Sequence, residues 1–255
     1  FKTEHSLIDQ SIHARSTHQT TNGDGFGIGW YSRSEGPGVY KDIRPAWNDA
    51  NLQALATQIE SPMFLAHVRA TTGTPVQRTN CHPFNYGKWL FVHNGLINDY
   101  NKLRRDLSIA VAAEYFPIIQ GSTDSEIMFL LALTFGLDGD VKAGLERMAG
   151  LVENIASTHG VENALQMTLG LSDGESLYAV RYSTEGRSRS LFHSSTRDET
   201  REIAPAASGF SRYARAIVSE PLSDLEDEWT LVPESSFLQI TKGNVTREPF
   251  SPIAP

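Results

Sequence analysis

The sequence predicts an α+β domain in which two mostly antiparallel sheets stack face to face, with helices on the outside of both. Three observations lead to this prediction. Strand-like segments come first, helical segments follow, and strand-like segments resume in the second half of the chain. Connections between successive strands are short, which favours antiparallel pairing. Two strands are apolar almost throughout and need cover on both faces, which a four-layer αββα sandwich provides.

The first third of the chain contains the strands on which this prediction depends. Residues 22–32 (NGDGFGIGWYS) alternate glycine with Phe26, Ile28 and Trp30, and a period of two indicates a strand. Glycine along one face lets another backbone or a ligand approach closely. The turn SEGPG leads into VYKDI, which predicts a hairpin. A helix is expected over 49–61, and MFLAHVRA and WLFVHNG are the two apolar strands.

The middle of the chain is predicted to be helical and the remainder to be strands. Three helices are expected: one over residues 98–113, a second that starts in the segment STDSEIMFLLALTFG, and a third over residues 140–157. In the second helix, Thr123 and Glu126 fit the Ser/Thr-x-x-Glu capping box. Residues 163–183 predict a hairpin that turns at Asp173-Gly174. Further strands are expected within 190–195, 214–221, 229–234, 236–243 and 245–250.

The domain organisation is expected to be simple. No clear linker divides the chain, so we predict a single domain over residues 1–255. The longest polar stretch, residues 195–213, is either a functional segment or a surface insertion.

Composition restricts the classes of function. The formal net charge is −8, and the sequence has no Lys/Arg cluster, which argues against nucleic acid as a partner. No apolar run reaches the length that spans a bilayer, so no membrane partner is expected. Cys81 is the one cysteine, so no disulfide can form within the chain. This favours a reducing, cytoplasmic setting.

The segment LFVHNGLI (90–97) places His93-Asn94-Gly95 at the end of a strand that is expected to be buried. Asn-Gly is a strong hairpin signal. The alternative is chemical, because an Asn amide and a Gly N–H are two donors that can stabilise a developing oxyanion. Arg69 and Asp124 also have ordinary explanations, as a surface ion-pair partner and as an acid that complements a helix dipole.

Taken together and in order, these stretches resemble the class II glutamine amidotransferases, which are N-terminal-nucleophile (Ntn) hydrolases. The matching motifs are His67-Val68-Arg69, His82-Pro83-Phe84, His93-Asn94-Gly95 and Thr123-Asp124-Ser125-Glu126. The glycine strand, EHSLIDQS near the start and VSEPLSDLEDEW near the end extend the resemblance over nearly the whole chain. The pattern is most similar to the stand-alone subfamily that includes γ-glutamyl amidases of thiol metabolism. The resemblance implies one type-2 glutamine amidotransferase domain with an Ntn-hydrolase-type αββα fold.

The resemblance also gives roles to individual residues. Arg69 would clamp the α-carboxylate of a γ-glutamyl group with its bidentate fork. Asp124 would pair with the α-ammonium group, and Asn94 and Gly95 would form the oxyanion hole. Further substrate-binding residues implied by the resemblance are Thr72, His93 and Thr123. Because Ala70 and Gly73 stand where better-known members have an aromatic residue and a histidine, we expect a differently shaped substrate mouth.

The family's nucleophile is a cysteine at the mature N-terminus, and its own α-amino group acts as the base. This sequence begins with Phe1, so we expect roughly one strand and one loop, on the order of 15–20 residues, to precede it. The alternative is a natural non-catalytic relative. Cys81 is not expected to substitute, because adjacent side chains of Cys81 and His82 point in opposite directions on a strand. His67, His82 and His93 are expected to be packed, hydrogen-bonded imidazoles rather than a metal site.

The sequence therefore predicts an enzyme that hydrolyses the γ-amide of glutamine, or the γ-glutamyl bond of a related compound, through a cysteine thioester. No metal or organic cofactor is expected. The expected partner is a small-molecule substrate, and a homo-oligomer or a separate partner subunit is possible by family analogy. A chain that lacks its nucleophile would instead be a regulatory module that binds glutamine or a γ-glutamyl compound. A purely structural domain would leave the combination of Arg69, Asn94 and Asp124 unexplained.

Overall fold

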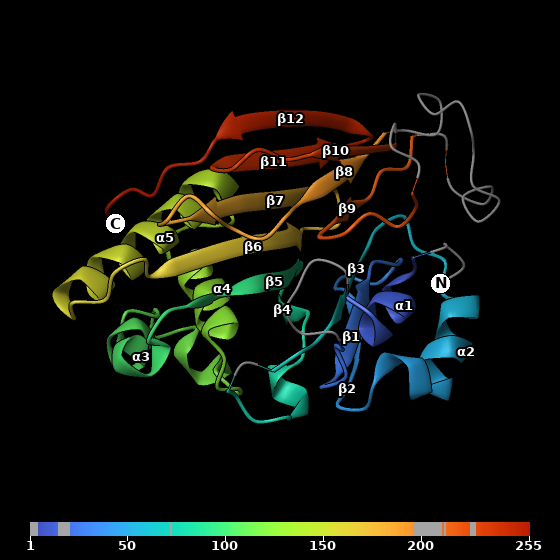
Figure 1. Cartoon of the computed structure of the whole chain (residues 1–255), viewed down its shortest axis with the longest axis horizontal. Coiled ribbons are helices and arrows are strands. Elements are labelled where there is room, and N and C mark those ends of the chain that lie inside the picture. Colours follow the sequence, from blue (N-terminus) through green and yellow to red (C-terminus); the bar gives the residue numbers. More distant parts are fainter. Residues whose placement is uncertain (1–4, 15–20, 72, 196–210, 212, 225–227) are drawn as a thin grey trace.

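The computed structural model describes residues 5–14, 21–71, 73–195, 211, 213–224 and 228–255. Within these ranges the strands form three antiparallel sheets. The largest has six strands in the order β12-β11-β7-β6-β5-β4, and two smaller sheets have the orders β2-β1-β3 and β10-β8-β9 (Figure 1). The segment 195–213, expected to be the longest loop, falls almost entirely outside the described residues. No helix in the described part of the chain combines the length and apolar character needed to cross a bilayer.

The first small sheet confirms the glycine strand and its hairpin. β1 (Phe26–Trp30) pairs antiparallel with β2 (Gly38–Asp42) on one side and with β3 (Phe64–Val68) on the other. A Cβ atom on Gly27 would lie 2.1 Å from the carbonyl oxygen of His82, and one on Gly29 would lie 2.7 Å from the Leu90 side chain. Glycine is therefore required along this face because the second sheet approaches it closely.

The six-stranded sheet contains the second apolar strand and both later hairpins. Its strands are β4 (Phe84–Tyr86), β5 (Trp89–Ile97), β6 (Leu165–Ser172), β7 (Ser176–Ser183), β11 (Ser236–Thr241) and β12 (Asn244–Pro249). The β6–β7 hairpin turns at Asp173-Gly174 as predicted, and Gly174 has the positive φ of 92° that favours glycine. The third sheet consists of β8 (Phe192–Ser194), β9 (Ile217–Val218) and β10 (Trp229–Leu231).

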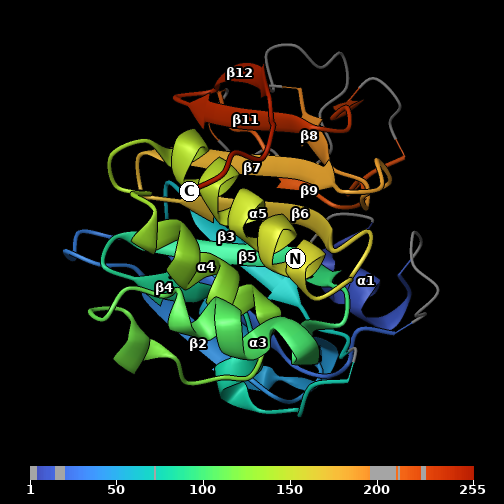
Figure 2. The same cartoon turned by 90° about the vertical axis from the view of Figure 1, so that its left-hand side faces the viewer.

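Helices cover both outer faces, which completes the predicted αββα arrangement. Figure 2 shows α3 (Tyr100–Ile109), α4 (Asp124–Thr134) and α5 (Val141–Thr158) across one face of the six-stranded sheet. The main core lies here, where Phe91 of β5 stacks on Phe129 of α4 with ring centroids 5.3 Å apart. The opposite face packs on the small sheets through buried apolar contacts that include Leu65 and Leu90.

One short helix covers the outer face of the β2-β1-β3 sheet. α2 (Ala50–Gln58) begins where Asp49 accepts a hydrogen bond from the Leu52 N–H at 2.7 Å, and Leu52 packs on Phe26 and Ile28. α1 (Leu7–Ile12) lies on the same side of the molecule (Figure 1). The 3₁₀ turns in the described residues are Ala46–Asn48, Arg78–Asn80 and Phe116–Ile118.

Two local expectations differ from the structure. The His93-Asn94-Gly95 triplet is neither a turn nor a strand end, because β5 continues through it to Ile97 and pairs with β6 along this length. The capping box is also only half formed. Thr123 accepts from the Glu126 N–H at 3.2 Å, but the Glu126 carboxylate accepts from the N–H groups of residues 120 and 121 instead of returning to Thr123.

Candidate active site

A cavity of about 1920 Å³ lies between the sheets and brings most of the predicted site residues together. Its lining includes the end of β3, the cavity side of β5 and β6, and the start of α4. The predicted site residues found in this lining are Arg69, His93, Asn94, Gly95, Thr123 and Asp124. Thr72 lies outside the described residues, so its predicted role stays a prediction.

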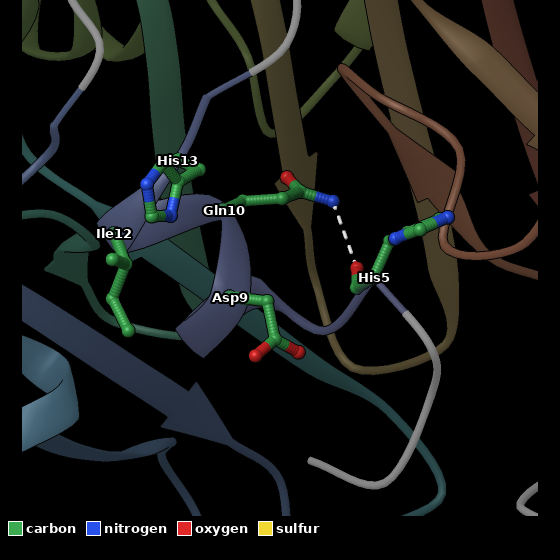
Figure 3. Close-up of a pocket in the computed structure, with 5 residues that line it drawn as sticks. All are labelled: His5, Asp9, Gln10, Ile12 and His13. Atoms are coloured by element: carbon green, nitrogen blue, oxygen red, sulfur yellow. Dashed lines mark hydrogen bonds between the residues drawn. The ribbon is translucent and has the colours of Figure 1, made fainter.

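A second pocket of about 190 Å³ lies against α1 and is lined by His5, Asp9, Gln10, Ile12 and His13 (Figure 3). The Gln10 amide donates to the His5 carbonyl at 3.1 Å inside it. Because none of the predicted site residues lies in this pocket, the larger cavity is the candidate active site.

Asn94 presents a free amide to the larger cavity. Side chains alternate along β5, so Phe91 and His93 face the helices while Val92 and Asn94 face the other sheet. Among the described residues, the Asn94 side chain has no hydrogen-bond partner, and it is half-buried. A half-buried amide without a partner is available as a donor to a ligand oxygen.

The backbone of Gly95 supplies a second donor beside Asn94. The Asn98 N–H donates to the Ala164 carbonyl at 2.8 Å, which fixes the phase of the β5–β6 ladder. In an antiparallel ladder only alternate residues bond to a given neighbour, so the N–H of Gly95 points away from β6. A Cβ atom at position 95 would lie 2.0 Å from the Gln166 carbonyl oxygen, so the ladder accommodates only glycine there.

Arg69 is a buried cation held by neutral oxygen atoms. It is 4% exposed, and its guanidinium donates to Thr74 Oγ1 at 2.6 Å and to Thr71 Oγ1 at 3.3 Å. Longer bonds at 3.3 and 3.4 Å reach the carbonyls of Asp24 and Pro75. No side-chain carboxylate forms an ion pair with this guanidinium in the described part of the chain. A buried charge without a counter-charge is costly, so this site is suited to a ligand carboxylate.

Asp124 connects the start of α4 to the strand that contains the two donors. Its Oδ2 accepts from the Ile97 N–H at 2.8 Å, and its Oδ1 accepts from the Ser125 N–H at 2.7 Å. Ile97 shares the ladder phase of Gly95, so its N–H likewise points away from β6. Thr123, whose side chain caps α4, precedes Asp124 and is 6% exposed. The Asp124 carboxylate therefore lies at the wall of the cavity, close to Asn94 and Gly95.

His93 lies on the opposite face of β5 from Asn94. Its Nδ1 contacts Ser125 Oγ at 2.9 Å and its Nε2 contacts the Gln166 carbonyl at 3.3 Å. Burial lowers the pKa of His93, so the ring is neutral near pH 7. These contacts hold β5 against α4 immediately before Asn94, and the predicted role of His93 in substrate binding stays a prediction.

Burial shifts the pKa values of two further histidines and of the one cysteine. His67 and His82 stack with ring centroids 4.2 Å apart, and burial lowers the pKa of His67 to about 4 and that of His82 well below its ordinary value. Contrary to expectation, neither ring nitrogen of His82 has a hydrogen-bond partner among the described residues. No group of three His, Cys, Asp or Glu side chains within the described ranges is arranged to hold a metal ion. Cys81 is fully buried, and burial raises the pKa of its thiol.

Sequence reasoning did not identify the residues that hold Arg69 in place. Thr74, which accepts from Arg69, belongs to no recognisable motif. The Asp24 carboxylate, just before β1, accepts from the Thr71 N–H, just after β3, at 2.8 Å. The contact between Asp24 and Thr71 depends on how β1 and β3 pair, so the spacing of these two residues in the sequence carries no signal.

An αββα sandwich with a cavity of this kind between its sheets is the architecture of the Ntn hydrolases. Residues 2–253 match the family model for class II glutamine amidotransferases. The chain therefore belongs to the class II glutamine amidotransferases, a family of enzymes.

Individual relatives agree with this assignment. The chain is 33% identical to the probable glutamine amidotransferase DUG3 of Saccharomyces cerevisiae, over 96% of this chain and 78% of that protein. It is 25% identical to the gamma-glutamyl-hercynylcysteine sulfoxide hydrolase of Mycobacterium tuberculosis, over 91% of this chain and 81% of that protein. A solved glutamine aminotransferase class-II domain protein from Silicibacter pomeroyi is 34% identical, with a TM-score of 0.76 over 89% of this chain and 92% of that chain.

Proposed function

We propose that the full-length protein hydrolyses the γ-amide of glutamine or the γ-glutamyl bond of a related compound through a cysteine thioester. The observation that carries this proposal is the pair of donors at Asn94 and Gly95, which face a cavity that also contains the buried cation of Arg69. Two donors on one fixed strand are suited to an oxyanion, and a buried arginine without a counter-charge is suited to a carboxylate.

Each residue takes one part of the substrate. Arg69 pairs with the α-carboxylate, and Asp124 accepts from the α-ammonium group. The γ-carbonyl oxygen lies between the Asn94 amide and the Gly95 N–H. A thiolate attacks the γ-carbon, and the negative charge that develops on oxygen is stabilised by these two donors. The leaving amine takes up the proton that the base removed from the thiol as the C–N bond breaks, and water then cleaves the thioester to release glutamate and restore the thiol.

The thiolate in this scheme does not come from Cys81. Its Sγ is fully buried, contacts the Asp42 carbonyl at 3.5 Å, and has a raised pKa, whereas a reactive cysteine needs access and a lowered pKa. We therefore assign the nucleophile not to Cys81 but, as in the family, to a cysteine at the mature N-terminus. Its α-amino group would serve as the base.

The names of two relatives support the two proposed kinds of substrate, which are glutamine and γ-glutamyl compounds. One is a probable glutamine amidotransferase, and the other is a hydrolase of a γ-glutamyl compound. Both names share the γ-glutamyl group, which is the part that Arg69, Asp124 and the two donors would recognise.

The test is glutamate release by protein expressed from its native start codon, with glutamine and γ-glutamyl dipeptides as substrates. We expect glutamate from at least one of these substrates, and we expect Cys81→Ala to retain the activity. Ligand binding without any glutamate release would instead identify a regulatory module, and loss of activity in a folded Cys81→Ala variant would contradict the assignment of the nucleophile.

A further inference from the structure

Arg189 is held one strand away from Asn94. It lies between β7 and β8, and its carbonyl accepts from Thr168 Oγ1 at 2.9 Å and from Arg181 Nε at 3.1 Å. Thr168 is the register partner of Asn94 across β5 and β6, and partners in an antiparallel pair share a face. The backbone of Arg189 is therefore fixed beside the cavity, next to the proposed oxyanion site.

The guanidinium of Arg189 has no hydrogen-bond or ion-pair partner among the residues that the structure describes. Its Nε is buried and has no hydrogen-bond partner, and no carboxylate in the described ranges forms an ion pair with it. Arg181 differs sharply, because it donates to the Val232 carbonyl and lies 3.5 Å from a Glu234 carboxylate oxygen. Leaving a buried charged donor unpaired is costly, so this position is suited to a ligand that supplies the missing acceptor.

The charge of Arg189 reaches the strand that carries the site. The pKa of His93 is lowered mainly by burial. Asp124 and the Gln166 carbonyl raise this pKa, and the Arg189 guanidinium lowers it further. The guanidinium is therefore within electrostatic range of the residue before Asn94. Burial also lowers the pKa of Arg189 itself, which is the expected result for a cation without a partner.

Resting on the proposed function, we propose that Arg189 determines substrate specificity by binding a carboxylate on the leaving group of a γ-glutamyl amino acid or peptide. Arg69 accounts for the α-carboxylate of the γ-glutamyl group, so a second cation has no role when the leaving group is ammonia. A γ-linked amino acid or peptide carries a second carboxylate on the other side of the scissile bond. The cavity of about 1920 Å³ has space for it, since pockets for drug-sized ligands occupy roughly 300–1,000 Å³.

The test compares three substrates with wild-type protein and variants. The substrates are glutamine, a γ-glutamyl dipeptide with a free carboxylate, and the same dipeptide with a terminal carboxamide. For Arg189→Gln we expect kcat/KM to fall about 10- to 100-fold on the free-acid dipeptide, through loss of a charge-assisted pair, and to change less than about threefold on the other two. Arg189→Lys should recover part of the loss. Arg187→Gln is the matched control, because Arg187 is exposed two residues away.

The substrate pair tests the proposal without any mutation. Wild-type protein should prefer the free acid over the carboxamide by a similar factor, and this preference should disappear in Arg189→Gln. Equal rates for the two dipeptides with wild-type protein, or an equal loss on all three substrates in a folded variant, would overturn the role of Arg189. Absence of glutamate release from every substrate would instead refute the proposed function, so the two failures are distinguishable.

Discussion

Replacing Asn94 with alanine separates catalysis from folding. The Asn94 amide has no hydrogen-bond partner among the described residues and faces the cavity, so its removal breaks no hydrogen bond with them. We expect the free energy of unfolding to change by less than about 1 kcal/mol. The same change removes one of two oxyanion donors, which lowers kcat by about 10²–10³, equivalent to roughly 2.7–4 kcal/mol of transition-state stabilisation.

The assay is steady-state glutamate release, with thermal and urea unfolding measured on the same preparations. Asn101→Ala is the matched control, because Asn101 also lines the cavity but lies exposed on α3. It should keep kcat within about threefold of wild type, since it contacts no reacting atom in the proposed scheme. An unchanged kcat in folded Asn94→Ala protein, or an equal loss in both variants, would refute the assignment of the oxyanion donor.

Three further predictions concern binding, packing and pH. Arg69→Ala should raise KM for γ-glutamyl substrates about 10-fold or more, measured by glutamate release, and an unaltered KM would argue against the carboxylate clamp. Gly27→Ala should lower the free energy of unfolding, measured in urea, by about 2–3 kcal/mol, because its Cβ would lie 2.1 Å from the His82 carbonyl oxygen. Gly170→Ala is the control, because its Cβ would meet nothing nearer than 3.4 Å and should be tolerated. Burial lowers the pKa of His67 to about 4 in the folded state, against about 6.5 when unfolded. The unfolded chain therefore binds more protons between these values, so this contribution is complete above about pH 6.5 and up to about 3 kcal/mol is lost as pH falls towards 4. A flat stability profile over this interval would contradict the burial of the ring.

The fold was predictable because periodicity and turn chemistry act locally. The glycine strand, the hairpin at Asp173-Gly174 and the helix that begins near Asp49 all rest on contacts within a few residues. The stacking of sheets followed from apolar strands that need cover on both faces. The αββα arrangement was therefore accessible from the sequence before any long-range contact was known.

The conformation of the Asn94-Gly95 segment was not predictable in the same way. Asn-Gly has a strong local preference for a turn, but pairing with β6 continues through it, and tertiary structure overrides the preference. The donor direction of the Gly95 N–H then depends on the phase of the ladder, which the bond between Asn98 and Ala164 fixes. The sequence therefore predicted a turn or a strand end where the strand continues, and the roles of Asn94 and Gly95 stay a prediction.

Arg189 shows the limit of motif reasoning. It lies between serines in a segment that reads as an ordinary polar connection, and no motif marks it. Its position beside the cavity arises from the bond between its carbonyl and Thr168, more than twenty residues earlier in the chain. That its guanidinium has no partner among the described residues can be recognised only once the neighbouring carboxylates have been located in space.

The most direct test of the central claim is to trap the acyl-enzyme. Full-length protein would be mixed with a γ-glutamyl substrate, quenched in acid within one turnover, and examined by intact and tandem mass spectrometry. The proposed mechanism predicts a mass increase of one γ-glutamyl group on an N-terminal cysteine, with accumulation reduced in Asn94→Ala. Glutamate release without any adduct, or an adduct located on Cys81, would contradict the thioester mechanism and the assignment of the nucleophile.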